Sequence, residues 1–440
     1  MTQAPHQTQI ETPETGSYFV SNYPPYRYWS AEKATPLPRS LQEHPSPEVP
    51  LGIYVHIPFC RQRCHFCYFK VYEGKNAREV DLYMSALLRE IDLLTQQPAI
   101  SGRKPLFLYF GGGTPSYISR DQFDRFMEGF NESISLADIQ EFTLECEPGT
   151  ISLEKLNAFK SAGVSRASLG IEHFDDEILS ANGRAHNRKA IYEAFEYMRK
   201  AQIPQVNIDL IAGMPGDRES SWLDTVQRTL DLQPDSVTIY QLEFPYNTTF
   251  SKELRAQGEL SVPTVDWPTK RSWTQMAFEQ LENSGYQLTS GYTASRKASK
   301  NSFVYRDALW RGADMLGVGV SAFSHIGGTN FQNEKHMQRY LEILENDQLP
   351  IQRGYALDET ERLIRELVLQ LKKGHLEPSY FQTKFGLDIS KVFEVPLSRL
   401  ESMGLLSRQK DRLCLTREAL LQVDQLLPDF FLAKHRNTRR

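Results

Sequence analysis

Three of the five cysteines in this 440-residue chain lie within the segment YVHIPFCRQRCHFCYFK. Cys60, Cys64 and Cys67 follow the spacing C-x3-C-x2-C, which places three thiols on one short loop where they can converge on a soft metal centre. No fourth cysteine lies nearby. A [4Fe–4S] cluster bound by only three cysteines leaves one iron open to another ligand, and this is typical of a cluster that takes part in chemistry.

A structural zinc site is the alternative for the same loop. His65 lies between the last two cysteines, so a Cys3His ligand set is available. Structural zinc sites usually combine two C-x2-C-like knuckles, and this chain lacks the second one. Cys146 and Cys414 are isolated, which disfavours a disulfide framework and favours a reducing cytoplasm.

The composition is that of an ordinary globular protein, with 40% hydrophobic and 24% charged residues. The N-terminal stretch MTQAPHQTQIETPETG lacks the basic and apolar regions of a signal peptide, and nowhere do eighteen uncharged apolar residues follow one another. We therefore expect a cytoplasmic protein without a membrane span. A net charge of -5 without a basic stripe gives no reason to expect a nucleic-acid partner.

The elements that must position the cysteines are predicted from apolar periodicity. Six short β-rich runs alternate with amphipathic stretches of helical period. The runs are 51–56, 105–110, 141–146, 166–171, 206–211 and 236–241, and the helical stretches include 77–94, 152–163 and 220–232. Six such units predict a parallel sheet with right-handed crossovers but are too few to close an eight-fold barrel. The fold class is therefore α/β, a partial (β/α)6 TIM-like barrel with the cysteine loop at its mouth.

Four domains follow from the pattern. Residues 1–50 contain nine prolines and should form an extended, irregular arm, while residues 51–245 form the barrel. Residues 246–354 are a barrel extension and rim, to which the glycine-rich stretch 312–328 returns. Residues 355–440 are helical and winged-helix-like, with a hairpin in LLSRQKDRLCLT and a last helix in REALLQVDQLL. Without a basic excess, this module is expected to cover an active site or bind protein instead of DNA.

Two further motifs follow the second and third strands. In YFGGGTPS, Gly111, Gly112 and Gly113 let the backbone approach a ligand closely, and their N–H groups can meet carboxylate or ribose oxygens. A tight turn is the alternative. LECEPG carries two carboxylates, and Glu145 points into the barrel mouth if Leu144 packs outward, by the period of two of a strand.

The cysteine spacing with Phe66 and Tyr68, at the start of a six-unit β/α series, resembles the radical S-adenosylmethionine (SAM) superfamily. In that superfamily the amino and carboxylate groups of SAM bind the open iron, and one electron from the cluster cleaves SAM to methionine and a 5′-deoxyadenosyl radical. The resemblance implies a cluster of low potential, roughly -400 mV or below, sheltered from water and oxygen. Phe59, Phe66, Tyr68 and Phe69 can provide that shelter.

More specifically, the motifs YVHIPFC, GGGTPS, SLGIEHF, NGR, NIDLIAGMPG and LGVGVSAFSHIGG resemble the oxygen-independent coproporphyrinogen III oxidases and their close relatives, over roughly residues 50–430. The resemblance implies a first SAM molecule at Tyr54, Gly112, Glu145 and Phe323. It implies a second SAM molecule at Phe66, Gly113, Thr114, Glu172, Arg184, Asp209 and Glu243. The segment Gly111 to Thr114 then resembles the motif that meets the methionine amino group.

The chain also departs from that family. The oxidases have a further cysteine after the third ligand, where this chain has Tyr68 and Phe69, and they have glutamine where this chain has Glu172. ALWRGADMLG replaces their Phe-Gln-Gly element. The sister branch of heme chaperones has a His-Asn pair and a Tyr-Trp ending that SKNSFVYRDALW does not reproduce. These departures concern the substrate and the second cofactor and leave the radical chemistry unchanged.

The resemblance thus implies a radical SAM [4Fe–4S] oxidoreductase that decarboxylates propionate side chains in porphyrin and heme biosynthesis. Glu145 and Arg184 are the expected catalytic residues, and Arg184, Arg166 or Arg296 can pair with substrate carboxylates. The implied partners are a tetrapyrrole or other aromatic small molecule and a low-potential electron donor such as flavodoxin or ferredoxin. Two alternatives stay open: a C-methyltransferase or cyclopropane-forming enzyme with a second SAM, and a heme chaperone without oxidase activity.

Overall fold

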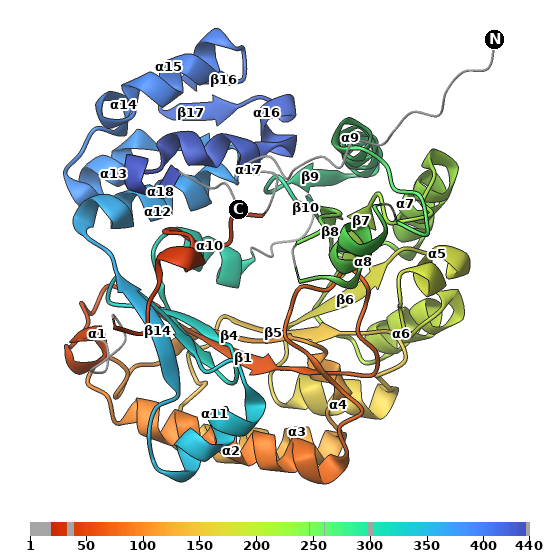
Figure 1. Ribbon diagram of the computed structural model, residues 1–440, viewed down its shortest axis with the longest axis vertical. Helices are drawn as coiled ribbons and strands as arrows, with labels where there is room; N and C mark the ends of the chain where they lie inside the picture. Colours follow the sequence, from red (N-terminus) through yellow and green to blue (C-terminus); the bar gives the residue numbers. More distant parts are fainter. Residues whose placement is uncertain (1–18, 33–38, 246, 259, 298–302, 437–440) are drawn as a thin grey trace.

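The computed structural model describes residues 19–32, 39–245, 247–258, 260–297 and 303–436, and a curved twelve-stranded sheet lies at its centre (Figure 1). From one edge to the other, the strands are β14 (Ile351–Ala356), β13 (Thr329–Asn333), β12 (Phe323–Ile326), β11 (Asp314–Val318), β1 (Leu51–Ile57), β4 (Pro105–Gly112), β5 (Glu141–Cys146), β6 (Arg166–Glu172), β7 (Gln205–Ala212), β8 (Ser236–Gln241), β10 (Thr293–Arg296) and β9 (Tyr286–Leu288). Two of these strands, β14 and β9, form the edges and are not joined, so the barrel is open.

Six parallel strands, β1 and β4 to β8, form the barrel wall and confirm the predicted β/α series. One face of these strands carries the apolar residues of the main core, whereas side chains of the other face, such as Tyr54 and Asp209, line the interior cavity. Ile53 and Val55 of β1 and Leu108 and Phe110 of β4, for example, are fully buried.

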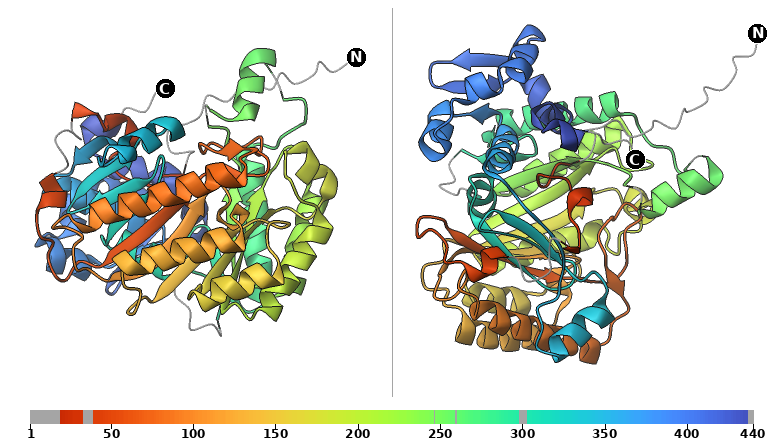
Figure 2. Two further views of the ribbon diagram at one scale, coloured as in Figure 1. Left: turned by 90° about the horizontal axis from the view of Figure 1, so that it is seen from below. Right: turned by 60° about the vertical axis from the view of Figure 1, so that its left-hand side comes forward.

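The crossover helices cover the outer face of this sheet (Figures 1 and 2). They are α2 (Ala77–Thr95), α3 (Arg120–Ser133), α4 (Leu153–Ser161), α5 (Asp176–Ala181), α6 (Arg188–Lys200) and α7 (Glu219–Leu232). Helix α2 starts with a capping box, in which Asn76 and Glu79 satisfy each other's backbone N–H groups. Among the described residues, no helix has the length and apolar character that a membrane span needs.

The segment 312–328, expected at the barrel rim, lies in the sheet itself. β11 pairs with β1 in parallel, and β12 continues antiparallel beside it. Leu316 and Val318 are buried between the layers, so this stretch is long and apolar enough to extend the wall. The other helices between the barrel and the C-terminal part are α8 (Thr249–Gln257), α9 (Trp267–Asn283), α10 (Val304–Trp310) and α11 (Met337–Glu345).

The C-terminal part is helical with a three-stranded antiparallel sheet, ordered β15 (His375–Leu376), β17 (Arg412–Leu415) and β16 (Leu406–Gln409). Its helices are α12 (Glu359–Leu371), α13 (Pro378–Phe385), α14 (Ile389–Val392), α15 (Glu394–Ser402), α16 (Arg417–Leu421), α17 (Val423–Leu426) and α18 (Ala433–Arg436). The hairpin agrees with the winged-helix-like prediction. The expected single last helix is interrupted, because Gln422 leaves the helical conformation at φ -124° and ψ 25°.

The described part of the N-terminal arm is irregular, as its prolines predict, with α1 (Arg39–Gln42) and the 3-10 turn Tyr26–Tyr28 as its short elements. Its aromatic residues nevertheless pack deeply. Tyr23 is fully buried against Phe431 and His435 of the C-terminal part, and Trp29 is buried on the barrel side. The arm therefore bridges the C-terminal part and the barrel.

A buried carboxylate links α2 to the added strands. Glu90 is 1% exposed and accepts hydrogen bonds from the Tyr340 hydroxyl (2.5 Å), Asn333 Nδ2 (2.6 Å) and the Gly319 N–H (2.8 Å). Burial raises the pKa of Glu90 to about 7, although these three donors oppose the rise. One side chain thereby fixes α11, β13 and the end of β11 against α2.

Replacing this carboxylate tests the link. Glu90→Ala should lower the free energy of unfolding by roughly 2–4 kcal/mol, because it leaves buried donors without an acceptor. Leu82→Ala, at a 55% exposed position of the same helix, should change it by less than about 0.5 kcal/mol. Denaturant unfolding of the full chain measures both, and equal effects would contradict the assignment.

Candidate active site

The inner face of the barrel lines a cavity of about 2460 Å³. Its other walls come from the N-terminal arm, α10, β12, β14 and α12. This volume exceeds the ~300–1,000 Å³ of a site for one small ligand. The cavity therefore has room for more than one molecule.

The cysteine loop follows β1 and is closed by a short parallel pair, β2 (Phe59–Cys60) and β3 (Tyr72–Glu73). Cys60 and Cys64 are buried, and Cys67 lines the cavity. Thr114 Oγ1 lies 3.5 Å from the Cys60 sulfur, and Arg184 Nη1 lies 3.0 Å from the Cys64 sulfur. The three thiols thus lie at the mouth of the barrel beside the end of β4.

Burial shapes the chemistry of these thiols. It raises the pKa of Cys60 to about 12 and that of Cys67 to about 11, and it also raises the pKa of Cys64 in spite of the Arg184 charge. A metal binds the thiolate, so the binding of a metal centre releases the protons that burial otherwise retains. The donor set of three thiols beside a guanidinium fits an anionic iron–sulfur cluster.

His65 does not complete a zinc site with these thiols. Its Nδ1 lies 3.1 Å from the Ala181 carbonyl, and its ring packs edge-on against Phe250. Within the described part of the chain, no three His, Cys, Asp or Glu side chains are gathered around a single point as ligands of one ion. The His65 imidazole therefore contacts the segment between β6 and α6.

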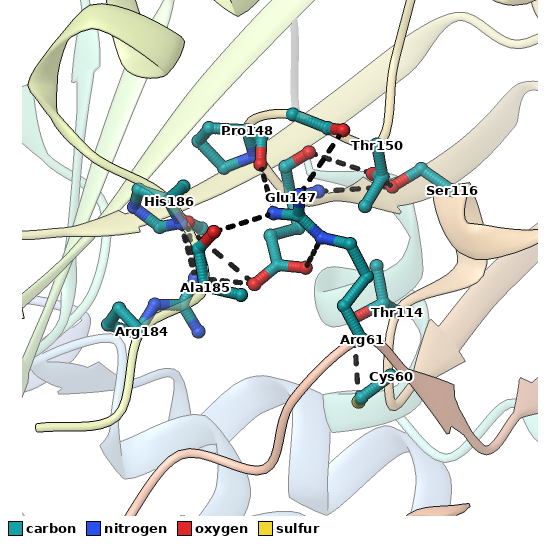
Figure 3. A network of polar contacts seen from close by, with 12 residues as sticks. Cys60, Arg61, Thr114, Ser116, Glu147, Pro148, Thr150, Arg184, Ala185 and His186 are labelled. Atoms are coloured by element: carbon teal, nitrogen blue, oxygen red, sulfur yellow. Dashed lines mark hydrogen bonds and ion pairs between the residues drawn. The ribbon is translucent and has the colours of Figure 1, made fainter. Parts of the chain in front are cut away.

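The carboxylate of Glu147 connects the cysteine loop to the segment that contains Arg184 and His186. Figure 3 shows Glu147, which follows β5, between Arg61, Arg184 and His186. Its carboxylate oxygens lie 3.6, 3.7 and 3.9 Å from nitrogen atoms of these three side chains, respectively. Burial opposes its ionisation, but His186, Arg184 and Arg61 outweigh this and hold the pKa of Glu147 below its ordinary value. Arg61 also donates to the carbonyl oxygens of Pro148 and Ala185.

The expected first SAM site is a group of stacked rings around Glu145. The Tyr109 hydroxyl and the Gly112 N–H donate to the two Glu145 oxygens, at 2.7 and 3.0 Å. Tyr54 stacks on Tyr109 with ring centroids 5.7 Å apart. Glu145 lines the cavity and Leu144 is buried behind it, as the alternation of a strand predicts. Burial raises the pKa of Glu145 to about 7.

The N–H groups of Gly112 and Gly113, which were expected to meet a ligand, have acceptors within the protein. The Gly112 N–H donates to Glu145, the Gly113 N–H to the Ile57 carbonyl and the Thr114 N–H to the Phe59 carbonyl. Close approach explains the glycines instead. A Cβ at Gly113 would lie 2.8 Å from the Phe59 carbonyl and 3.1 Å from the Cys60 sulfur, and Gly112 adopts φ +121°. Gly111 and Gly112 do not line the cavity, whereas Gly113 and Thr114 do.

The expected second SAM site is a polar group beside the cysteines. Arg184 lies 3.4 Å from Glu172, whose backbone is held in the left-handed region at φ +61°. Burial works against the charge of Arg184, but Cys64, Glu172 and Glu147 outweigh it and raise its pKa. Burial raises the pKa of Glu172 to about 7.

Asp209, Glu243 and Phe66 lie on the same cavity wall. Asp209 accepts from Ser168 Oγ (2.6 Å) and Asn207 Nδ2 (3.0 Å), and burial raises its pKa. Glu243 accepts from the Phe19 N–H of the arm at 2.7 Å, and burial raises its pKa to about 8. The structure therefore brings these residues together at one cavity, on β7, after β8 and in the cysteine loop.

Phe323, expected at the first SAM, lies under the arm. Its ring stacks on Tyr26 at 4.4 Å and meets Trp29 edge-on at 5.7 Å. The expected aromatic shelter of the cysteines is only partly formed, since Phe59 is buried but Tyr68 and Phe69 are 47% and 43% exposed. Phe250 of α8 adds a ring that packs edge-on against His65 of the cysteine loop.

The arginines expected to bind substrate carboxylates are placed differently. Arg184 is engaged by Cys64 and two carboxylates. Arg166 lines the cavity but donates to Ser236 and Gln205 and packs on the Phe303 ring. Arg296 does not line the cavity, because its position in β10 places it over Tyr286.

Sequence reasoning missed Glu147, His186 and Arg61. Each lies next to a recognised feature, in LECEPG, after the NGR segment and directly after Cys60. The period of two that selected Glu145 does not apply to Glu147, because β5 ends at Cys146. The sequence therefore marks these three residues only as ionisable side chains that follow a recognised motif.

The radical SAM superfamily model matches residues 54–229, and the HemN C-terminal domain model matches residues 357–421. A heme chaperone HemW from Synechocystis sp. is 30% identical over 336 residues, 74% of this chain and 78% of that protein. The chain belongs to the radical SAM superfamily. An oxygen-independent coproporphyrinogen III oxidase from Escherichia coli is 28% identical to this radical SAM protein over 74% of this chain and 72% of the relative. The solved structure of coproporphyrinogen III oxidase (HemN) from Escherichia coli matches it with a TM-score of 0.81 at 25% identity, over 94% of this chain and 96% of that one.

This radical SAM protein is thus a member of the HemN family, whose relatives are named both as oxidases and as heme chaperones. Its cofactors are a [4Fe–4S] cluster and SAM. The described residues fit both groups, because two buried thiols, a third thiol that lines the cavity and the Arg184 guanidinium lie beside an acidic part of the cavity lining. Cys60, Cys64 and Cys67 are the residues that would hold the cluster.

The three loop cysteines can be tested by cluster content. Changing any one of them to Ala should reduce iron and acid-labile sulfide to near background after anaerobic reconstitution, because one iron loses its thiolate. Cys146→Ala, a buried cysteine in β5, should keep the wild-type content. A complete cluster in a loop variant would contradict the assignment.

Gly113→Ala tests the close approach at Cys60. The added Cβ must displace Phe59 or the sulfur, so we expect roughly tenfold weaker cluster retention, the scale of a disturbed ligand surrounding. Gly74→Ala is the matched control near the same loop, since its Cβ meets nothing within 4 Å and φ +65° adds only local strain. Loss of iron to a chelator measures retention, and equal rates in the two variants would refute the contact.

Proposed function

We propose that this HemN-family protein oxidatively decarboxylates propionate side chains of a porphyrinogen. The observation that carries the proposal is the cavity, which has the cysteine loop on one wall and aromatic and cationic side chains on the opposite walls. A volume of about 2460 Å³ suits a cofactor together with a large flat substrate. The match to the HemN structure over 94% of the chain supports the same reading.

In the proposed reaction, a hydrogen atom leaves the carbon β to a carboxylate. CO2 then departs, one electron passes to an acceptor, and a vinyl group remains. The cluster and SAM, when bound, supply the group that removes the hydrogen atom. A low-potential donor such as flavodoxin or ferredoxin would reduce the cluster.

The residues of this chain would bind and orient the reactants. Glu145, held by Tyr109 and Gly112, would face the cationic end of SAM. Arg184 would neutralise negative charge beside Cys64 while Glu147 and Glu172 fix its position. The arm and α12 would exclude water from the cavity, which strengthens each of these charge interactions.

A C-methyltransferase or cyclopropane-forming activity is a second candidate. Glu172, Asp209 and Glu243 add three carboxylates to the cavity beyond Glu145, and a second SAM molecule carries the positive charge that would match them. A heme chaperone is a third candidate, favoured by the 30% identity with the HemW of Synechocystis sp.. Both share the cysteine loop and the cavity with the leading candidate.

An anaerobic assay with coproporphyrinogen III distinguishes the three. The reconstituted protein with SAM and reduced flavodoxin should release CO2 and form vinyl products in step with 5′-deoxyadenosine. Glu145→Gln should reduce kcat/KM by roughly 100-fold or more, because it removes a charge that contacts the cofactor.

Other products would assign the other functions. S-adenosylhomocysteine beside 5′-deoxyadenosine would favour the transferase. Stoichiometric heme binding without cleavage of SAM would favour the chaperone. Uncoupled 5′-deoxyadenosine with unchanged coproporphyrinogen would reject the decarboxylation.

A further inference from the structure

Arg353 and Arg365 of the cavity lining have no carboxylate within ion-pair distance among the described residues. The same holds for Arg166, but Ser236, Gln205 and the Phe303 ring hold that guanidinium. Arg353 of β14 donates to Gln332 Oε1 (2.7 Å) and to the Tyr26 carbonyl (3.2 Å). Arg365 of α12 is 4% exposed and donates through Nε to Asn22 Oδ1 (2.9 Å), while its Nη1 has no hydrogen-bond partner. Every acceptor named for these two guanidinium groups is neutral.

The two carboxylates whose charges act on Arg365 are paired with other cations. Asp314 pairs with Arg103 at 2.8 Å, and Glu366 pairs with Lys384 at 2.7 Å. Burial lowers the pKa of Arg365 to about 10 even though Glu366 and Asp314 oppose the shift. Burial likewise lowers the pKa of Arg353. The protein itself therefore does not neutralise this part of the cavity.

Three other cations of the cavity lining do have a carboxylate partner. Arg184 faces Glu172 and Glu147, Arg306 faces Asp307 at 2.9 Å, and Lys372 faces Asp424 at 3.2 Å. Uncompensated charge is costly in a buried site unless a ligand supplies the opposite charge. Arg353 and Arg365 thus differ from these cations in needing an external anion.

The residues around Arg353 and Arg365 indicate what kind of molecule carries the anionic groups. Tyr26, Trp29 and Phe323 form an aromatic group on the same wall, with the Arg353 guanidinium 6.0 Å from the Trp29 ring. The charges of both arginines act on the Tyr26 hydroxyl, so both lie near the same aromatic residue. Flat apolar surface beside two cations suits an aromatic or macrocyclic molecule with separate anionic substituents.

We propose that Arg353 and Arg365 bind two carboxylate groups of the substrate, one at each guanidinium. This proposal rests on the proposed function and specifies its substrate class as a flat molecule with at least two carboxylates. A guanidinium matches a carboxylate through two parallel N–H donors. Asn22 holds Arg365 through Nε, whereas Gln332 holds Arg353 through Nε and the Tyr26 carbonyl holds it through Nη1, so each guanidinium keeps further N–H donors for a carboxylate. The arm thereby positions the substrate-binding groups in addition to covering the cavity.

Binding of coproporphyrin III, the stable and fluorescent oxidised tetracarboxylate, tests the pair. Titrations use the full-length, cluster-loaded protein with Arg353→Gln, Arg365→Gln and the double variant. Each single change should raise Kd about tenfold and the double change about a hundredfold, as expected for loss of charged hydrogen bonds. The matched control is Arg362→Gln, an exposed arginine of α12 that donates to the Gly327 carbonyl and does not line the cavity, and it should bind like the wild type.

The tetramethyl ester of coproporphyrin III separates charge from shape. It should bind the wild type at least tenfold more weakly than the acid and show no dependence on either arginine. Arg365→Lys keeps the charge and should give a Kd between those of the wild type and Arg365→Gln. If Arg365→Gln does not fold, the lysine variant provides the test of this position.

The inference is overturned if the glutamine variants bind the tetracarboxylate like the wild type, if the ester binds as well as the acid, or if the wild type binds neither. Failure of the proposed function looks different. In that case arginine-dependent binding is observed, but coproporphyrinogen III yields no vinyl product. Normal turnover by the double variant would instead retain the function and reject the arginine assignment.

Discussion

The charge balance around Glu147 is the constraint on which the site depends. This buried carboxylate lies between Arg61, which follows Cys60, and Arg184, which contacts the Cys64 sulfur. The two arginines bring positive charge to a loop that must hold an anionic cluster, and the carboxylate keeps them from repelling each other. This arrangement adds a charge link between the cysteine loop and the residues that follow β5 and α5.

The cavity also brings groups of opposite charge together, over a larger distance. Its barrel wall is acidic, with Glu145, Glu172 and Asp209 at or near the ends of successive strands. Its opposite wall carries Arg353 and Arg365, held by the arm. A cationic cofactor and an anionic substrate are therefore matched to opposite sides of one enclosed space, where low dielectric strengthens each interaction.

The arm and the C-terminal part determine how this space is closed. Tyr23 is buried against Phe431 and His435, which fixes the arm to the last residues of the described chain. Tyr26 and Trp29 then reach Phe323 at the barrel edge. Enclosure thus depends on contacts between segments some four hundred residues apart, as in the bond of the Tyr23 hydroxyl with His435 Nδ1 across 412 positions.

The sequence by itself determined the features whose signals are local. The C-x3-C-x2-C spacing, the six apolar runs and the alternation that turns Glu145 inward each lie within a few neighbouring residues, and the structure reproduces the runs and the orientation. Periodicity carries such information because it reflects which face of one element is buried. The family resemblance added the cofactors, which the comparisons support.

Only the tertiary structure decided which groups are engaged and which remain available. It directed the glycine N–H groups to protein acceptors, turned Arg296 away from the cavity and joined Arg353 and Arg365 to residues more than three hundred positions earlier. An arginine in a sequence looks the same whether a carboxylate neutralises it or not. Its partner is chosen by the packing of distant elements, and no local pattern of residues encodes that choice.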